Sequence, residues 1–197
     1  MQASIINKPF VGLVLAGGLS SRMGTDKAEL IINGQSLLEK NKALLTQLGA
    51  KSVLVSGKNQ GQIADKHQQA GPLAGIHAAL EFVPQNYALM VVPVDMPKLT
   101  PELLNQLIQF GCQQQCSCYF EQHFLPVYFY DVAQLKAELN RIMQQSAKQR
   151  SVRAVLKAVD ATEIKLNEPA KIQNLINVNT QVQWQAYIDE QTNKIYS

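Results

Sequence analysis

The sequence has no long apolar run, little net charge and few cysteines. Its apolar runs are far shorter than the roughly 20 residues needed to cross a bilayer, which argues against a membrane-spanning helix. The 18 Lys and Arg residues against 15 Asp and Glu give a net charge of only +3, so neither nucleic acid nor a membrane surface is expected as a main partner. The amino terminus lacks a charged leader followed by an apolar core, and we therefore expect a cytoplasmic protein.

The three cysteines, Cys112, Cys116 and Cys118, lie in one segment, and their odd number argues against a disulfide framework. A C-x-x-x-C-x-C cluster can bind a soft metal, with His123 as the candidate fourth ligand. No second Cys or His pair stands nearby at zinc-ligand spacing. We therefore expect reduced thiols that are small, partly buried residues of a strand.

Short apolar runs and amphipathic patterns alternate along the chain, whose 197 residues are 46% apolar and suit one domain. This alternation favours an α/β fold with a mostly parallel central sheet and helices on both faces. Pro126 predicts that the strand around it lies at an edge or begins there. Strands are expected at 10–15, 53–55, 89–92, 117–120, 124–130 and 174–178, and helices at 37–48, 72–82, 101–110, 132–143 and 151–156.

The most informative stretch follows the first strand and reads L-A-G-G-L-S-S-R-M-G-T-D-K. Gly17 and Gly18 leave backbone N–H groups unobstructed, and Arg22 and Lys27 bring positive charge to the same loop. Such a loop at the carboxyl end of a parallel strand suits a polyphosphate. The spacing fits neither a Walker A loop nor the G-x-G-x-x-G fingerprint, so it indicates a third kind of phosphate loop. The alternative is a plain glycine-rich connection.

Asp95 comes directly after the third apolar strand, in V-V-P-V-D-M-P. An aspartate at this point lies at the carboxyl edge of the sheet, where open α/β proteins bind ligands. One carboxylate, with triphosphate oxygens and waters, is a common way to hold Mg²⁺. We therefore expect Asp95 to be a Mg²⁺ ligand. Capping of the helix that Pro101 begins is the alternative, but Thr100 is better placed for it.

Two further motifs extend this pattern. G-P-L-A-G begins at Gly71, with Pro72 where a helix tolerates a missing N–H, and N-V-N-T begins at Asn177. Together with the loop and V-D-M-P, they resemble the nucleotidyltransferases that load a nucleotide onto a sugar phosphate or a pterin. The Gly-Gly form of the loop followed by Asp26 and Lys27 is most similar to that of the molybdenum cofactor guanylyltransferases.

This resemblance implies a three-layer Rossmann-like nucleotidyltransferase fold and transfer of GMP from GTP to molybdenum-bound molybdopterin. Residues 1–110 would form the nucleotide-binding half and 111–197 the acceptor-binding half. The attacking phosphate is already ionised, so no general base is needed, and catalysis would come from Arg22 and Lys27 on the triphosphate and Asp95 on the metal. The implied nucleotide site comprises Leu15, Ala16, Gly17, Gly18, Lys27, Ser56, Asp65, Gly71, Pro72, Leu73 and Asp95.

Recognition of the base is harder to predict. Guanine presents N–H donors, so its site must supply acceptors, and backbone carbonyls near Leu15, Ser56 and Gly71 are candidates. The family usually has Asn where this chain has Ser56, a departure that bears on base selectivity rather than on catalysis.

On the acceptor side, the segment 148–153 concentrates cations, and Arg150, with Arg153 beside it, is a candidate to meet the anionic acceptor. A solvated loop is the alternative. Asn177 and Asn179 are candidates for hydrogen bonds near the metal, although strand ending and helix capping are equally open. The resemblance implies two protein partners, the enzyme that delivers the pterin and the molybdoenzymes that receive the product.

Other functions remain open at this point. The same loop would serve a cytidylyltransferase for the same pterin or a sugar-phosphate nucleotidyltransferase. A GTP-binding partner without chemistry is a further alternative. The presence of Arg22, Lys27 and Asp95 together speaks against such an inert descendant.

Overall fold

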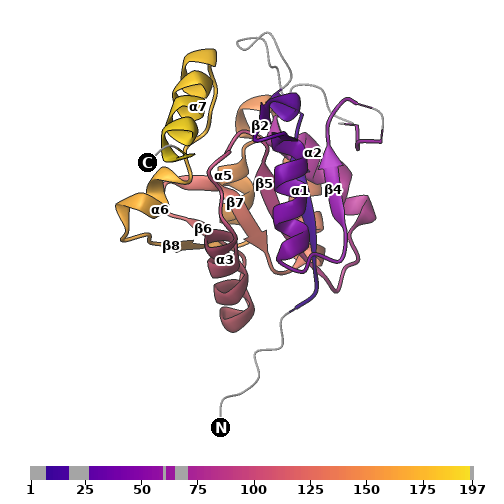
Figure 1. Cartoon of the computed structure of the whole chain (residues 1–197). Helices are drawn as coiled ribbons and strands as arrows, with labels where there is room; N and C mark the ends of the chain where they lie inside the picture. The colour runs from indigo at the N-terminus through magenta and orange to yellow at the C-terminus, as the bar shows by residue number, and fades with distance from the viewer. Residues whose placement is uncertain (1–7, 18–26, 60, 65–70, 196–197) are drawn as a thin grey trace.

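The centre of the protein is a six-stranded sheet with the order β4-β1-β5-β7-β6-β8 (Figure 1). The computed structural model describes residues 8–17, 27–59, 61–64 and 71–195. β1 pairs in parallel with β4 and β5, and β6 with β8, whereas β7 runs antiparallel between β5 and β6. The predicted mostly parallel sheet is therefore confirmed. The strands are β1 (Phe10–Leu15), β4 (Val53–Ser56), β5 (Ala88–Pro93), β6 (Cys118–Phe120), β7 (His123–Phe129) and β8 (Thr162–Ile164).

Helices cover both faces of this sheet, as predicted. Successive side chains of a strand point to opposite faces, and Val14 packs in the core under α1 and α3 while Leu13 packs in the core under α2, α4 and α5. Of the described helices, none has the length and apolarity that a membrane crossing requires. The helices are α1 (Leu37–Gln47), α2 (Pro72–Ala79), α3 (Pro101–Gln114), α4 (Val132–Met143), α5 (Val152–Ala158), α6 (Pro169–Gln173) and α7 (Gln181–Ile195).

Several helices begin where a side chain caps them. The hydroxyl oxygens of Ser36, Thr100 and Ser151 and the carboxylate of Asp131 each accept a hydrogen bond from the backbone N–H three residues on. Such caps satisfy one of the N–H groups that the first turn leaves unpaired. Because Thr100 caps α3, Asp95 is not engaged in this role.

The remaining elements are a short hairpin and several 3-10 turns. β2 (Ile31–Ile32) and β3 (Gln35–Ser36) form a small antiparallel hairpin ahead of α1. Its turn places Asn33 and Gly34 at positive φ, as the Asn-Gly pair predicts. Among the described residues, the 3-10 turns η2 (Lys27–Glu29), η3 (Leu80–Phe82) and η4 (Ala147–Gln149) lie between the larger elements. η2 brings Lys27 to the edge of the sheet at which β1 ends.

Two predictions about strands were wrong. Pro126 lies inside β7, which is an interior strand. It is tolerated because β5 pairs with β7 only as far as Val127, and the register of β6 with β7 shifts between Tyr119 and Phe120. The segment 174–178 is not a strand: it crosses the carboxyl end of β5, where Val178 N–H donates to the Asp95 carbonyl over 2.8 Å.

Candidate active site

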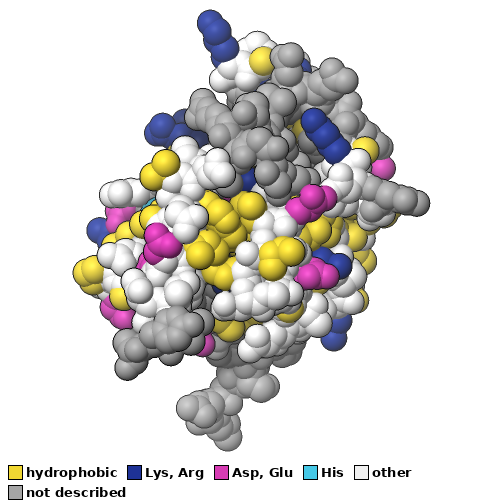
Figure 2. Space-filling view, turned by 45° about the horizontal axis from the view of Figure 1, so that its top comes forward, with side chains coloured by type: hydrophobic (Ala, Val, Ile, Leu, Met, Phe, Trp, Pro, Cys, Tyr) yellow, Lys and Arg dark blue, Asp and Glu magenta, His cyan; other side chains and the backbone are white. Residues whose placement is uncertain are grey.

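The carboxyl ends of β1 and β5 lie side by side. Leu15 pairs with Pro93 in the sheet, and the N–H of Val94 donates to the Leu15 carbonyl over 3.0 Å. In Figure 1 β1 runs upward from the amino terminus, so its carboxyl end points to the top of the view. Figure 2 turns this top forward and shows apolar side chains gathered in the middle of the face that it presents. Gly17 and Asp95 therefore leave the sheet at the same edge, which is the meeting that the two motifs predict.

Four polar residues form an edge cluster at this point: Lys27, Asp95, Asn177 and Asn179. Lys27 Nζ lies 3.2 Å from Asp95 Oδ2 and donates to Asn179 Oδ1 over 2.7 Å. Asn177 Nδ2 donates to Asp95 Oδ1 over 3.1 Å. The side chains of Lys27 and Asp95 keep 17% and 18% of their surface exposed, so a ligand can reach both.

A small hollow of about 180 Å³ adjoins the edge cluster. Many of the residues predicted for the nucleotide site line it, and Pro93, Val94 and Leu125 line it as well. Pro93 and Val94 belong to the motif V-V-P-V-D-M-P that contains Asp95, so this motif indicated them. Leu125 comes from β7 and no local pattern indicated it. The lining consists of Leu15, Ala16, Gly17, Lys27, Pro72, Pro93, Val94, Asp95, Leu125 and Asn177.

Some predicted nucleotide-site residues do not reach this hollow. Ser56 is 2% exposed and lies behind Gly75, where an added Cβ would come 2.1 Å from the Ser56 Oγ. Gly71 and Leu73 line a neighbouring hollow instead. Gly71 has φ 56° and ψ −143°, a region that glycine alone adopts readily, and it begins α2. Gly18, Arg22 and Asp65 lie outside the described residues.

The carbonyls considered for guanine recognition already accept backbone hydrogen bonds. Those of Leu15, Ser56 and Gly71 accept from Val94, Ala16 and Ala74, at 3.0, 2.9 and 3.2 Å. A carbonyl oxygen has two lone pairs, so each keeps capacity for one further donor. A guanine N–H group could therefore bind each of these carbonyl oxygens only through its second lone pair.

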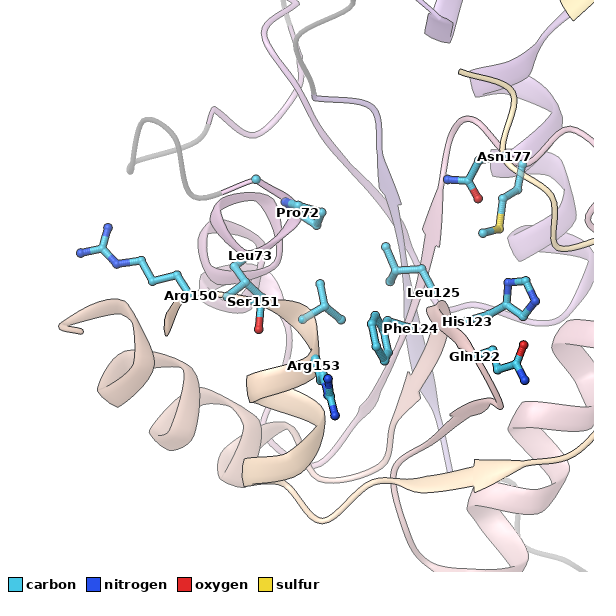
Figure 3. A pocket seen from close by; sticks show the side chains of 13 residues that line it. Pro72, Leu73, Gln122, His123, Phe124, Leu125, Arg150, Ser151, Arg153 and Asn177 are labelled. Atoms are coloured by element: carbon cyan, nitrogen blue, oxygen red, sulfur yellow. The ribbon is translucent and has the colours of Figure 1, made fainter. Parts of the chain in front are cut away.

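A larger hollow, of about 550 Å³, continues from the small one. The two share Pro72, Leu125 and Asn177, and the larger one extends between β7 and the start of α5 (Figure 3). Arg150 and Arg153 both line it, but Figure 3 shows the guanidinium of Arg150 extending away from Leu125, and its Nε donates to the Gln145 carbonyl over 2.9 Å. Partial burial lowers the pKa of His123 below its ordinary value and so favours the neutral ring.

The donor set at the edge cluster suits a metal ion only in part. Within the described ranges, no three His, Cys, Asp or Glu residues gather closely enough to hold a metal by themselves. Asp95 offers one accessible carboxylate, each oxygen of which already accepts one hydrogen bond. Mg²⁺ is commonly bound by one or two carboxylates together with substrate phosphates. Asp95 therefore fits Mg²⁺ when a triphosphate supplies the other oxygens.

Two of the cysteines, Cys112 and Cys118, belong to the core, and Cys116 is half-buried. Cys112 and Cys118 are buried, all three thiols are free, and burial raises the pKa of the Cys118 thiol above its ordinary value. Cys118 Sγ donates to the Leu107 carbonyl over 3.2 Å, and Cys112 Sγ lies 3.3 Å from Tyr128 Oη. Their expected place in one strand is correct for Cys118 alone, since Cys112 lies in α3 and Cys116 in the turn that follows.

The sheet order and covering helices define the nucleotidyltransferase type of α/β fold. A molybdopterin-guanine dinucleotide biosynthesis protein A from Archaeoglobus fulgidus superposes with a TM-score of 0.72, 22% identity and coverage of 93% of this chain and 99% of that one. A 4-diphosphocytidyl-2C-methyl-D-erythritol synthase from Anaerococcus prevotii superposes with a TM-score of 0.71, 10% identity and coverage of 95% and 98%. At these identities the likeness shows the fold.

Sequence similarity places the chain within that class. Residues 12–163 match the MobA-like NTP transferase domain, and the chain belongs to this family. A molybdenum cofactor guanylyltransferase from Xanthomonas euvesicatoria is 38% identical over 187 residues, which cover 94% of this chain and 97% of the relative. A second protein of that name, from Rhizobium leguminosarum, is 33% identical over 174 residues, with coverage of 82% and 81%. The resemblance inferred from the motifs is confirmed.

Proposed function

We propose that this protein transfers GMP from GTP to molybdenum-bound molybdopterin, which yields molybdopterin guanine dinucleotide and pyrophosphate. The names of the relatives, at 33–38% identity over most of the chain, support this reaction. The observation that carries it is the position of the edge cluster beside two connected hollows. A transferase for two substrates needs two such adjoining sites with charged groups between them.

The smaller hollow is the proposed nucleotide site. Lys27 contributes a cation that binds the triphosphate, and Arg22 from the same loop contributes a second. Asp95 would hold Mg²⁺ together with triphosphate oxygens, and the ion would supply neutralisation of the charge that develops on pyrophosphate. Leu15 and Pro93 give the hollow apolar walls, which strengthen these electrostatic interactions by excluding water.

The larger hollow is the proposed acceptor site. The terminal phosphate of the acceptor forms a new bond to the α-phosphorus, the bond to the β-phosphate breaks, and pyrophosphate leaves with that electron pair. No residue has to remove a proton, because the attacking oxygen is already ionised. Asn177 borders both hollows and donates to Asp95, so it fixes the carboxylate at the boundary between the substrates.

The proposed reaction also implies partners and a location. The acceptor would come from the enzyme that inserts molybdenum into the pterin, and the product would pass to molybdoenzymes. We place the reaction in the cytoplasm, where GTP is supplied. Nucleic acid has no role in this proposal.

A direct assay tests the proposed function. Purified protein is incubated with each nucleoside triphosphate, Mg²⁺ and molybdenum-loaded pterin, and dinucleotide and pyrophosphate are measured. We expect GTP to be the preferred donor, with activity lost on chelation and restored by Mg²⁺. Preference for CTP would indicate a cytidylyltransferase, activity on sugar phosphates alone would indicate that class, and binding without turnover would indicate an inert partner.

Matched variants connect the assay to the site. Lys27→Ala is expected to reduce turnover by several orders of magnitude, since it removes a cation from the triphosphate. Lys42→Ala, at an exposed position of α1, serves as the control and is expected to keep full activity. Equal activities of the two variants would exclude Lys27 from the nucleotide site.

A further inference from the structure

Phe124 is an exposed aromatic residue in the wall of the larger hollow. Phe124 is 41% exposed, although the later residues of the same strand, Val127–Phe129, are fully buried. The ring of Tyr119 lies behind it, with the two centroids 6.3 Å apart and the planes inclined by 48°. An aromatic pair of this geometry holds the outer ring in a defined position.

The exposed side of this ring faces the hollow. Figure 3 shows Phe124 and Leu125 on one side of the open space, with Leu73 and Ser151 on the other. The exposed Phe82, by contrast, is 58% exposed in η3 and does not line the hollow. The apolar surface of Phe124 is thus presented to a ligand at this site, at the cost of leaving a phenyl ring in water when the site is empty.

The charges of the larger hollow all have one sign. Among its lining residues, all of which the structure describes, Arg150 and Arg153 carry positive charge and no Asp or Glu is present. Arg153 also lies close enough to Tyr119 to act on its hydroxyl electrostatically. Arg153 thus lies within electrostatic reach of Tyr119, although it comes from α5 whereas Tyr119 and Phe124 come from β6 and β7. This combination suits a ligand that has both a flat ring and an anionic group.

We propose that Phe124 is a specificity-determining residue, whose ring stacks on the planar heteroaromatic system of an anionic acceptor while Arg153 attracts the anionic group. The identity of the acceptor as a pterin rests on the proposed function. The stacking itself rests on the exposure of Phe124, its support by Tyr119 and the absence of carboxylates among the residues that line the hollow. A planar ring selects flat ligands because stacking requires contact over the whole face.

A binding experiment tests this role without turnover. The probe is pterin-6-carboxylate, a planar anionic pterin, and its intrinsic fluorescence is titrated with protein. Phe124→Leu keeps an apolar side chain but removes the flat ring, and it is expected to raise Kd on the order of tenfold. Phe124→Tyr restores the ring and is expected to bind within about twofold of the wild type. Phe82→Leu is the matched control and is expected to leave Kd unchanged.

The role of the Arg153 charge is tested separately, by comparing binding of pterin-6-carboxylate with binding of uncharged pterin. Arg153→Gln is expected to weaken binding of pterin-6-carboxylate and to leave binding of pterin itself unchanged. Arg141→Gln, at an exposed position of α4, is the control. Equal loss for both probes would contradict the role of Arg153, because an electrostatic contact acts only on the anion.

The outcomes separate this inference from the proposed function. If the wild type transfers GMP and Phe124→Leu keeps the acceptor KM, the inference fails and the function stands. If the wild type binds pterin-6-carboxylate in a Phe124-dependent manner but transfers no nucleotide, the function fails and the stacking role stands. Absence of saturable binding by the wild type, or an equal effect of Phe82→Leu, would overturn the stacking role. In the transferase assay we expect Phe124→Leu to raise the acceptor KM without changing that of GTP.

Discussion

Lys27 and Asp95 are 68 residues apart in the sequence, and their side chains form an ion pair with Nζ 3.2 Å from Oδ2. Asn177 and Asn179 complete this contact from the segment that leads into α7. The end of the first loop, the end of β5 and the approach to α7 therefore meet at one point. A substitution that displaces one of these segments is expected to displace side chains of the others. Asp95 contacts Lys27 and Asn177, and Lys27 also contacts Asn179.

Asp95→Asn is expected to reduce turnover by roughly a thousandfold, because it removes the negative charge that would hold the metal at the triphosphate. The fold is expected to persist, since the Asp95 carbonyl still accepts from Val178 N–H. Initial rates at saturating Mg²⁺ and far-UV circular dichroism measure the two effects. Asp189→Asn, at an exposed position of α7, is the control. Near-normal activity of Asp95→Asn would exclude the carboxylate as a metal ligand.

Asn179→Ala is expected to raise the KM for GTP about tenfold with a smaller change in kcat, because Lys27 loses the oxygen that orients its ammonium group. Helix α7 is expected to remain folded, since Thr180 Oγ1 still accepts from Gln183 N–H over 3.2 Å. Steady-state kinetics with varied GTP measure the effect. Asn193→Ala, farther along α7, provides the comparison, and a KM equal to that of the wild type in both variants would show that Asn179 does not orient Lys27.

The features that the sequence predicted well depend on local chemistry. β1 and β5 are buried along their whole length, so each is an uninterrupted apolar run that stands out without tertiary information. The cap at Thr100 requires only a side chain three residues before an N–H. The position of Gly17 and Asp95 at one edge of the sheet followed from a single rule: the carboxyl ends of neighbouring parallel strands lie at the same edge.

The features that were missed depend on contacts distant in sequence. The segment 174–178 was expected to be a strand, because alternating Asn and apolar residues give the same pattern whether a segment pairs as a strand or crosses a sheet edge. The contact of Asn177 with Asp95, 82 residues away, belongs to the second arrangement. Ser56 is the last residue of β4, and only the approach of Gly75 decides that it is buried. The sequence does not distinguish an aromatic residue that packs in the core from one that lines a hollow, as Phe124 does.

Tyr119→Phe is expected to destabilise the protein by about 1 kcal/mol near pH 8, because it removes the hydrogen bond from Tyr119 Oη to Glu163 Oε1, 2.6 Å long. Burial, together with this bond, raises the pKa of Tyr119 to about 12. Since the folded pKa lies above the unfolded value of about 10, this stabilisation is complete below pH 10 and is lost as the pH rises toward 12.

Urea unfolding at pH 8, 10 and 11 measures this difference between the wild type and Tyr119→Phe. The difference is expected to be constant up to about pH 10 and to shrink above it. Glu163→Ala removes the other partner, and the double variant is expected to lose less than the sum of the single losses. Additive losses would mean that the two side chains do not interact in solution.

Gly75→Ala is expected to destabilise the protein by about 2 kcal/mol, although alanine is the better helix former. The added Cβ would lie 2.1 Å from Ser56 Oγ and 3.0 Å from Leu15 Cδ2, within the buried contact of α2 with the sheet. Removal of the hydroxyl by Ser56→Ala in the same chain is expected to restore part of the loss, while Ser56 Cβ, at 2.9 Å, retains the rest. Urea unfolding of the wild type, both single variants and the double variant gives the coupling energy. A stability gain in Gly75→Ala alone, as helix propensity would produce, would show that α2 moves away from β4 freely and that the close approach is not required.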